Sequence, residues 1–180
     1  QLPRGDFRAM PAWLPASKAC GIKWVNVHPG NRRRGLPSVM AVIVMNDPAT
    51  GRPLAVLDGR WITKLRTAAA GAVAARHLAP EQVETVGVMG TGLQAELQIR
   101  ALQLVRAFRR LLAWGRDMAK AQAYAARMTQ TLPLPVEVCD DRARLVQQAQ
   151  LVVTTTPARA PLIEADWLHP GLHVTAMGSD

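Results

Sequence analysis

Apolar and polar positions along the chain divide it into two parts that meet near Pro80. In the first part, residues 21–28 alternate in polarity and residues 39–45 form a continuous apolar run, and both patterns are typical of strands. Turn-forming residues after this run predict an antiparallel return. The first 18 residues, rich in proline and polar breaks, predict an irregular lead-in. The expected strands cover residues 6–11, 21–28, 39–45 and 53–57, and one helix covers residues 61–79.

Beyond Pro80, strand and helix patterns alternate, which predicts a parallel sheet with helices on both faces. The expected strands cover residues 85–89, 110–114, 136–138, 151–155 and 172–176, and the expected helices cover residues 93–107, 117–129 and 141–148. We therefore predict an α/β fold in which a Rossmann-type doubly wound sheet occupies residues 81–180. A partial α+β domain precedes it over residues 1–80. Because such a sheet normally continues past its last strand here, and no Met opens the chain, we expect a fragment truncated at both ends.

The strand at residues 85–89 runs directly into a G-x-G-x-x-A turn and then a helix. Gly90 permits a sharp turn, Gly92 leaves no Cβ in the way of a pyrophosphate, and Ala95 lets the helix lie close to the sheet. The unpaired N–H groups and the dipole of the helix N-terminus favour a phosphate. This order of strand, turn and helix predicts a dinucleotide site formed by Gly90, Thr91, Gly92, Leu93, Gln94 and Ala95.

The end of the second strand of this part bears on the choice of cofactor. NAD-preferring sites usually place an acidic side chain there for the ribose 2′-hydroxyl, whereas this chain has Gly115 followed by Arg116. An arginine suits a 2′-phosphate, so we expect NADP(H) to be favoured over NAD(H). Asp117 either contacts the ribose or, more in keeping with its position, caps the next helix.

Three threonines, Thr154, Thr155 and Thr156, close the strand at residues 151–155. Their hydroxyl and N–H groups could face the cofactor ribose or nicotinamide. The alternative is an ordinary strand exit held by threonine hydroxyls.

Two cations lie among apolar residues in the first part of the chain. Lys23 shares a strand face with Val25 and Val27, where an ammonium could bind a carboxylate, although a strand lysine more commonly reaches solvent along its stem. Arg66 shares a helix face with Ile62 and Val73 and therefore requires an anion, either a substrate or an acidic side chain across the domain junction. The small residues that follow Arg66 would permit close helix packing.

Composition limits the remaining possibilities. The longest apolar run, Val39–Met45, is far too short to span a bilayer, and no secretory leader opens the chain, so a cytoplasmic protein without a membrane is the expectation. The two cysteines and four histidines show no metal-ligand spacing. The net charge of +9 comes from scattered Lys and Arg with only 4% aromatic residues, which argues against nucleic-acid binding.

Several further motifs occur in a fixed order, and with them the chain resembles the ornithine cyclodeaminase and mu-crystallin family. The matching segments are residues 9–11 (AMP), 21–25 (GIKWV), 53–59 (PLAVLDG), 65–69 (LRTAA), 90–95 (GTGLQA) and 176–180 (AMGSD). They cover nearly the whole chain and are more specific together than the glycine turn alone.

The resemblance implies a homodimer in which an open-barrel substrate and dimerisation domain is joined to an NAD(P)-binding domain. It implies that Lys23 and Asp180 are catalytic and that Lys23, Arg66 and Met10 bind the substrate, with Arg66 forking around its carboxylate. Thr67 is a weaker candidate for a phosphate contact. Asp180 would move the proton at the substrate nitrogen.

The family resemblance also implies a reaction on a small α-amino or α-imino acid. The leading case converts ornithine to proline and ammonia: hydride leaves the Cα, the side-chain amine attacks the resulting imine, ammonia departs and the hydride returns. Alternatives within the family are a ketimine or cyclic-imine reductase and an alanine dehydrogenase. A cofactor-gated binding protein of the crystallin type is an alternative of another class.

Overall fold

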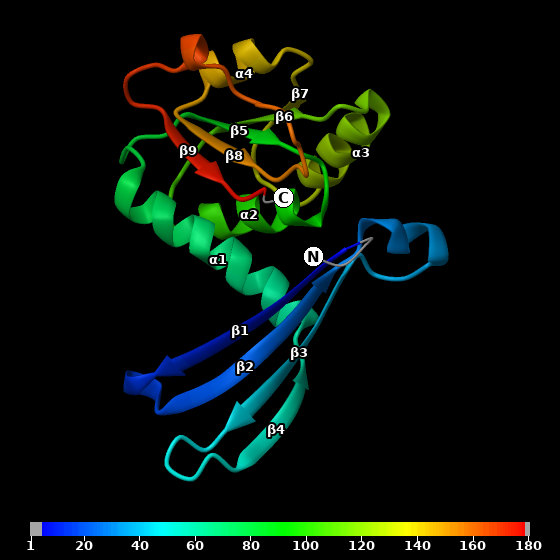
Figure 1. The fold of residues 1–180 in the computed structure, drawn as a ribbon. Helices are drawn as coiled ribbons and strands as arrows, with labels where there is room; N and C mark the ends of the chain where they lie inside the picture. Colours follow the sequence, from blue (N-terminus) through cyan, green and yellow to red (C-terminus); the bar gives the residue numbers. More distant parts are fainter. Residues whose placement is uncertain (1–4, 179–180) are drawn as a thin grey trace. The chain divides into compact units, whose positions relative to one another are not determined.

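The computed structural model describes residues 5–178 of the chain, which form two compact units that divide between Leu65 and Arg66 (Figure 1). The sequence places the boundary at Pro80, after the helix, whereas the compact units divide within α1 (Arg60–Leu78). Asp180 lies outside the described residues.

The first unit contains one antiparallel sheet of four strands in sequential order. Its strands are β1 (Asp6–Leu14), β2 (Ala19–Val27), β3 (Val39–Asn46) and β4 (Pro53–Asp58). The strand expected at residues 6–11 is confirmed and continues to Leu14. The irregular lead-in is wrong over residues 12–14, because all nine residues of β1 pair with β2. Pro11 does not prevent this pairing because β1 is an edge strand, where a missing N–H can face away from the ladder. Short 3-10 turns at Pro15–Ser17 and Pro29–Arg34 lie in the loops of this unit.

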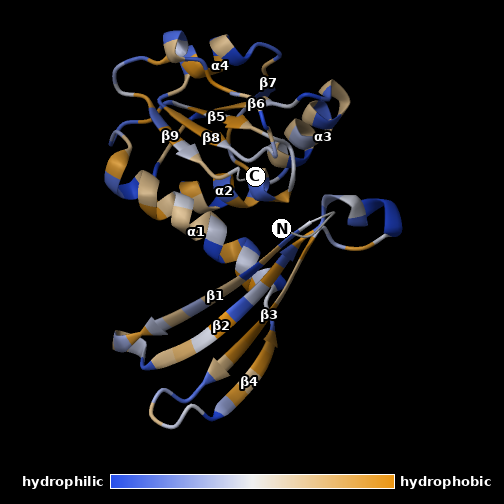
Figure 2. Cartoon of the chain, in the orientation of Figure 1, coloured by the Kyte–Doolittle hydropathy of each residue, from blue (hydrophilic) through white to orange (hydrophobic). Residues whose placement is uncertain are grey.

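The register of this sheet separates two apolar faces. Lys23 lies opposite Met10 on β1 and Ile43 on β3, so these three side chains share one face with the buried Val25. The other face carries Trp24 and Val42, which are 39% and 46% exposed. Figure 2 shows the hydrophobic colouring that runs along β3 and β4.

Helix α1 buries a different stripe from the one that the sequence suggests. The buried residues of this helix are Ala68, Gly71, Ala72 and Ala75. Arg66 and Val73, which share the predicted apolar face, are both exposed. Small residues allow the closest packing, so this stripe, rather than the one with larger side chains, meets the rest of the second unit.

The second unit contains five parallel strands in the order β7-β6-β5-β8-β9. In chain order its elements are β5 (Thr85–Met89), α2 (Leu93–Gln103), β6 (Arg110–Trp114), α3 (Met118–Thr129), β7 (Val136–Val138), α4 (Arg142–Gln148), β8 (Leu151–Thr154) and β9 (His173–Ala176). A 3-10 turn at Ala165–Trp167 precedes β9. The alternation predicted from the sequence is confirmed.

Helix α2 ends at Gln103, whereas the sequence predicts an end near residue 107. After Gln103 the chain leaves the helix. The Arg106 guanidinium then donates hydrogen bonds to the carbonyl oxygens of Arg76, Ala79 and Pro80, at 2.7, 3.1 and 3.0 Å. These carbonyls lie at and just beyond the C-terminus of α1, where the helix dipole favours a cation.

The central strands are buried on both faces, as expected for a doubly wound sheet. On one face, Val86 and Val88 of β5 pack with Ile99 of α2 and Tyr124 of α3. On the other face, Met89 packs with residues of α4, including Leu145. Figure 1 shows α2 and α4 on opposite sides of this sheet.

Candidate dinucleotide-binding site

The site lies where the order of the parallel strands reverses. β5 is hydrogen-bonded to β6 on one side and to β8 on the other, so the chain leaves the first strand of the domain at the centre of the sheet. In open α/β sheets, ligands bind in the crevice at the carboxyl ends of the strands beside such a switch point. The glycine turn between β5 and α2 lies at this position.

Gly90 makes the sharp exit from β5. Its φ is +124°, a value that residues with a side chain rarely adopt, and a Cβ there would overlap the Thr155 hydroxyl. The Gly90 N–H donates to the carbonyl of Trp114 at 2.9 Å, and the Thr155 N–H donates to the carbonyl of Met89 at 2.8 Å. These bonds join the exits of β6, β5 and β8.

Gly92 is the N-cap of α2 and leaves space for a ligand. A Cβ at Gly92 would have no atom within 4 Å, and no side chain caps this end of the helix. Ala95, completely buried, holds the first turn close to the sheet. Exposed N–H groups at the start of an 11-residue helix, next to open space, fit the phosphates of a dinucleotide.

Packing, as well as cofactor choice, explains the glycine at the end of β6, Gly115. A Cβ at Gly115 would lie 2.8 Å from the Thr91 methyl group of the glycine turn. Arg116, the next residue, is exposed. The sequence alone could not reveal this contact because Thr91 and Gly115 lie 24 positions apart.

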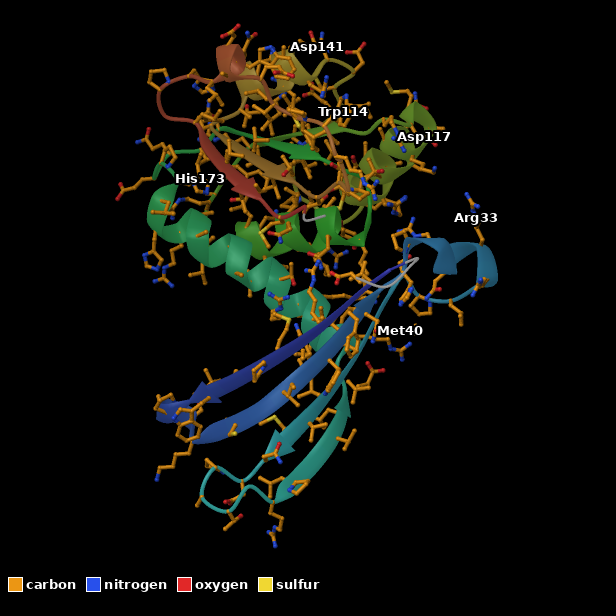
Figure 3. The ribbon with its side chains drawn as sticks, in the orientation of Figure 1. Arg33, Met40, Trp114, Asp117, Asp141 and His173 are labelled. Atoms are coloured by element: carbon orange, nitrogen blue, oxygen red, sulfur yellow. The ribbon has the colours of Figure 1, made fainter. Side chains whose placement is uncertain are left out.

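Asp117 caps α3, which was the preferred interpretation of its position (Figure 3). Its Oδ1 accepts a hydrogen bond from the Lys120 backbone N–H at 3.2 Å, and its Oδ2 lies 2.9 Å from the Lys120 ammonium. Hydrogen bonds from the Lys120 side chain and backbone hold the pKa of Asp117 below its usual value. Both carboxylate oxygens of Asp117 therefore interact with Lys120 of the helix that Asp117 caps.

The three threonines at the end of β8 lie in two different surroundings. Thr155 lies against the glycine turn, with its hydroxyl 3.4 Å from the Met89 carbonyl. Thr154 and Thr156 instead line a hollow of about 250 Å³ at the carboxyl ends of β8 and β9. The Thr156 hydroxyl is buried in the described part of the chain without a hydrogen-bond partner.

The loop between β8 and β9 supplies wall residues that sequence reasoning missed. Leu162 and Ile163 line the hollow and also pack against the core cluster that contains Met89 of β5 and Leu145 of α4. Arg142 holds this loop, because its guanidinium donates to the carbonyls of Pro161 and Leu162, each at 3.3 Å. In the sequence, the only sign of this wall was the apolar pair Leu162-Ile163 directly after Pro161.

Arg142 is itself fixed by two aromatic rings. Its guanidinium carbon lies 5.6 Å from the ring centre of Trp114 and 5.5 Å from that of Trp167. The stack therefore connects the exit of β6 with the loop that walls the hollow.

The substrate-binding candidates are distributed over both units. Met10 and Lys23 lie on paired strands of the first sheet, with Met10 exposed and Lys23 half-buried. Arg66 and Thr67 belong to α1 in the second unit, where Arg66 is exposed and forms no salt bridge with any residue in the range 5–178.

Two absences hold for residues 5–178. No helix within this range is long and apolar enough to cross a membrane. No group of three or more His, Cys, Asp or Glu side chains in the same range is arranged to hold a metal ion.

The strand order, the glycine turn and the N-terminus of α2 define a Rossmann-type domain with a dinucleotide-binding crevice. The chain belongs to the ornithine cyclodeaminase/mu-crystallin family, whose model matches residues 1–180. Alanine dehydrogenase from Archaeoglobus fulgidus is 40% identical over 188 residues, which cover 100% of this chain and 54% of that protein. The chain thus spans about half the length of this relative.

Solved structures of related enzymes match the fold of this chain. An archaeal alanine dehydrogenase dimer with bound NAD matches with a TM-score of 0.89 and 38% identity, over 97% of this chain and 53% of that one. Delta(1)-pyrroline-2-carboxylate reductase from Thermococcus litoralis, in complex with NADH and L-proline, matches with a TM-score of 0.87 and 31% identity, over 98% and 58%.

Proposed function

We propose that this chain is part of an NAD(P)-dependent oxidoreductase or cyclodeaminase that acts on a small α-amino or α-imino acid. The observation that carries the proposal is the uncapped N-terminus of α2, with open space at Gly92, at the switch point of a parallel sheet. Family membership and the NAD or NADH in the two related structures support it.

Each part of the crevice suits one part of the cofactor. The first-turn N–H groups of α2 would hold the pyrophosphate, and the hydroxyls of Thr154 and Thr156 would face the nicotinamide end. When bound, a nicotinamide supplies a site that accepts or donates hydride. Leu162 and Ile163 would give the adjoining hollow an apolar wall.

On the substrate side, Arg66 binds the α-carboxylate. Its exposed guanidinium has no ion-pair partner among the described residues of the second unit and can offer two parallel N–H groups to one carboxylate. Lys23 and Met10 contribute from the first unit, Thr67 contacts a cofactor phosphate, and Asp180 transfers the proton at the substrate nitrogen. These four roles rest on the matching family motifs.

For the cofactor, we propose a preference for NADP(H) over NAD(H). Asp117 is engaged with Lys120, and Arg116 is exposed beside Gly115, so the exit of β6 offers a cation rather than a carboxylate. Isothermal titration of the protein in its full natural length should give a lower Kd for NADPH than for NADH. Equal or tighter binding of NADH contradicts this preference.

The leading specific reaction is the conversion of ornithine to proline with release of ammonia. The second candidate is a reductase or dehydrogenase without ring closure, favoured by the 40% identity to an alanine dehydrogenase. A screen of ornithine, alanine and cyclic imino acids with the full-length protein, following nicotinamide absorbance and ammonia together, separates the two. Ammonia and proline without net change in cofactor oxidation state indicate the first; stoichiometric cofactor turnover indicates the second. Ligand binding with no turnover of any substrate contradicts both and indicates a binding protein of the crystallin type.

We also propose that the protein is a homodimer that associates through the sheet of the first unit. Trp24, Val42 and Val56 expose 39%, 46% and 71% of their surface on one face of that sheet, which is unusual for a monomeric surface. Sedimentation equilibrium should give twice the monomer mass. Replacing Val42 by Glu should give the monomer mass, whereas a monomeric wild type contradicts the proposal.

A further inference from the structure

Gln98 of α2 is a buried polar side chain that contacts the helix carrying Arg66 and Thr67. Only 2% of its surface is exposed. Its Nε2 donates a hydrogen bond to the Thr67 carbonyl oxygen at 3.0 Å. A buried amide is expensive unless it is bonded, so this contact is maintained in the folded state.

The glycine one turn after Thr67 makes room for this amide. A Cβ at Gly71 would overlap the Gln98 Oε1 and would lie 3.2 Å from the Thr175 methyl group of β9. Because Thr67 and Gly71 are four residues apart, they lie on the same face of α1. One turn of α1 therefore packs against Gln98 of α2 and Thr175 of β9.

Thr175 is fixed in turn by a neighbouring residue on its own strand. It is 6% exposed, and its hydroxyl lies 3.0 Å from Nε2 of His173 (labelled in Figure 3). β9 leads into residues 177 and 178, whose N–H groups both donate to the Thr154 carbonyl, at 2.9 and 3.0 Å. The contact at Gly71 thus joins three segments: α1 with Arg66, α2 with the phosphate-binding end, and β9 beside the hollow.

We propose that Gln98 is a positioning residue that fixes the register of α1 against α2 and thereby places Arg66 and Thr67 relative to the glycine turn. The buried stripe of α1 consists only of alanine and glycine. Such small side chains interlock little with a neighbouring helix, so they do not by themselves select one register. A directional hydrogen bond to one carbonyl selects one register. The consequence for substrate binding rests on the role proposed above for Arg66.

The physical reason for a kinetic effect is the precision that a bidentate clamp needs. A displacement of about 1 Å at a substrate-binding group can cost up to about 100-fold in rate. Gln98→Met keeps the length and volume of the side chain but has no N–H to donate. Gln103→Met is the matched control, because Gln103 lies on the same helix, is half-buried and is not part of the proposed site.

The test uses the full-length wild type, Q98M and Q103M, with active protein counted by cofactor titration. We expect the KM for the amino or imino acid to rise about tenfold in Q98M, while the Kd for NADPH stays within about twofold, as judged from the cost of misplaced binding groups. Q103M should match the wild type in both. A purely structural role would reduce the active fraction and leave KM unchanged.

A second pair of variants keeps the inference testable if Q98M folds poorly. Gly71→Ala should clash with Gln98 and lower Tm, and Gly71→Ala combined with Gln98→Ala should recover Tm but retain the raised KM. An unchanged KM in Q98M or in the double variant overturns the positioning role while leaving the proposed function intact. A wild type that turns over no amino or imino acid overturns the proposed function and this inference with it.

Discussion

Gly90 lies so close to Thr155 that a Cβ on the glycine would overlap the threonine hydroxyl. The two residues come from the exits of adjacent strands, β5 and β8, and the Thr155 N–H donates to the carbonyl immediately before Gly90. The two strand exits therefore meet at the crevice through a main-chain hydrogen bond and through the close approach of the Thr155 hydroxyl to Gly90.

Gly90→Ala should destabilise the protein by about 2 kcal/mol or more, because the positive φ and the overlap with Thr155 add their costs. Urea unfolding monitored by circular dichroism gives the difference in free energy of unfolding. A variant as stable as the wild type would show that the turn relaxes around the added methyl group and that the contact with Thr155 is not rigid.

Gly92→Ala should behave in the opposite way. Its φ of −88° is accessible to alanine and its Cβ would meet no atom, so stability should change by less than about 0.5 kcal/mol. The new methyl group would occupy the approach of the phosphates and weaken NADPH binding about tenfold or more. Gly30→Ala, also in open space but in the first unit, is the control and should leave Kd unchanged. Unaltered NADPH affinity in Gly92→Ala would place the cofactor elsewhere.

Gly115→Asp, the substitution that would offer a carboxylate to the ribose of NAD(H), should fail by itself. Its Cβ would lie 2.8 Å from the Thr91 methyl group and push against the glycine turn, so we expect weaker binding of both nucleotides. Adding Thr91→Ser removes that methyl group and should shift the preference toward NADH. Titrations of both variants with NADH and NADPH measure this, and a single variant that already binds NADH more tightly than the wild type does would refute it.

His173 should make stability depend on pH below about 6.5, its usual pKa. Burial, with a smaller contribution from the positive charge of Arg106, lowers the pKa of His173 in the folded state. The unfolded chain therefore binds the proton more readily, so the stabilising contribution is present above about pH 6.5 and is lost as the pH falls. His173→Gln should show a smaller loss of unfolding free energy between pH 7.5 and 5.5, and His77→Gln, at an exposed position, should not. Identical pH profiles for wild type and His173→Gln would rule the effect out.

Tyr124→Phe should leave stability unchanged or raise it by about 1 kcal/mol. The phenol oxygen is buried in the described part of the chain without a hydrogen-bond partner, and burial raises the pKa of Tyr124 well above its usual value. Phenylalanine keeps the ring in the core and removes the desolvated hydroxyl. Thermal unfolding at pH 7 tests this, and a clear loss of stability would indicate a bound water or another partner for the hydroxyl.

The sequence determined the second unit almost completely. Alternating strand and helix patterns gave the strands of the parallel sheet to within one residue at each end, and the G-x-G-x-x-A turn indicated the crevice, because these features depend on neighbours in the chain. The cap formed by Asp117 was also readable, since capping is a local interaction over three residues. Family motifs added Lys23, Met10, Arg66, Thr67 and Asp180, whose roles remain predictions.

Tertiary structure alone decided which faces and distant pairs meet. Both faces of α1 carry small or apolar residues, so the pattern could not tell that Gly71 rather than Val73 would be buried; that depends on Gln98 and Thr175, which approach from other elements. The pairing of nine β1 residues with β2, the contact between Gly115 and Thr91, and the hold of Arg142 on the loop at Leu162 arise in the same way. Periodicity reports which residues share a face, whereas only the folded chain determines what that face contacts.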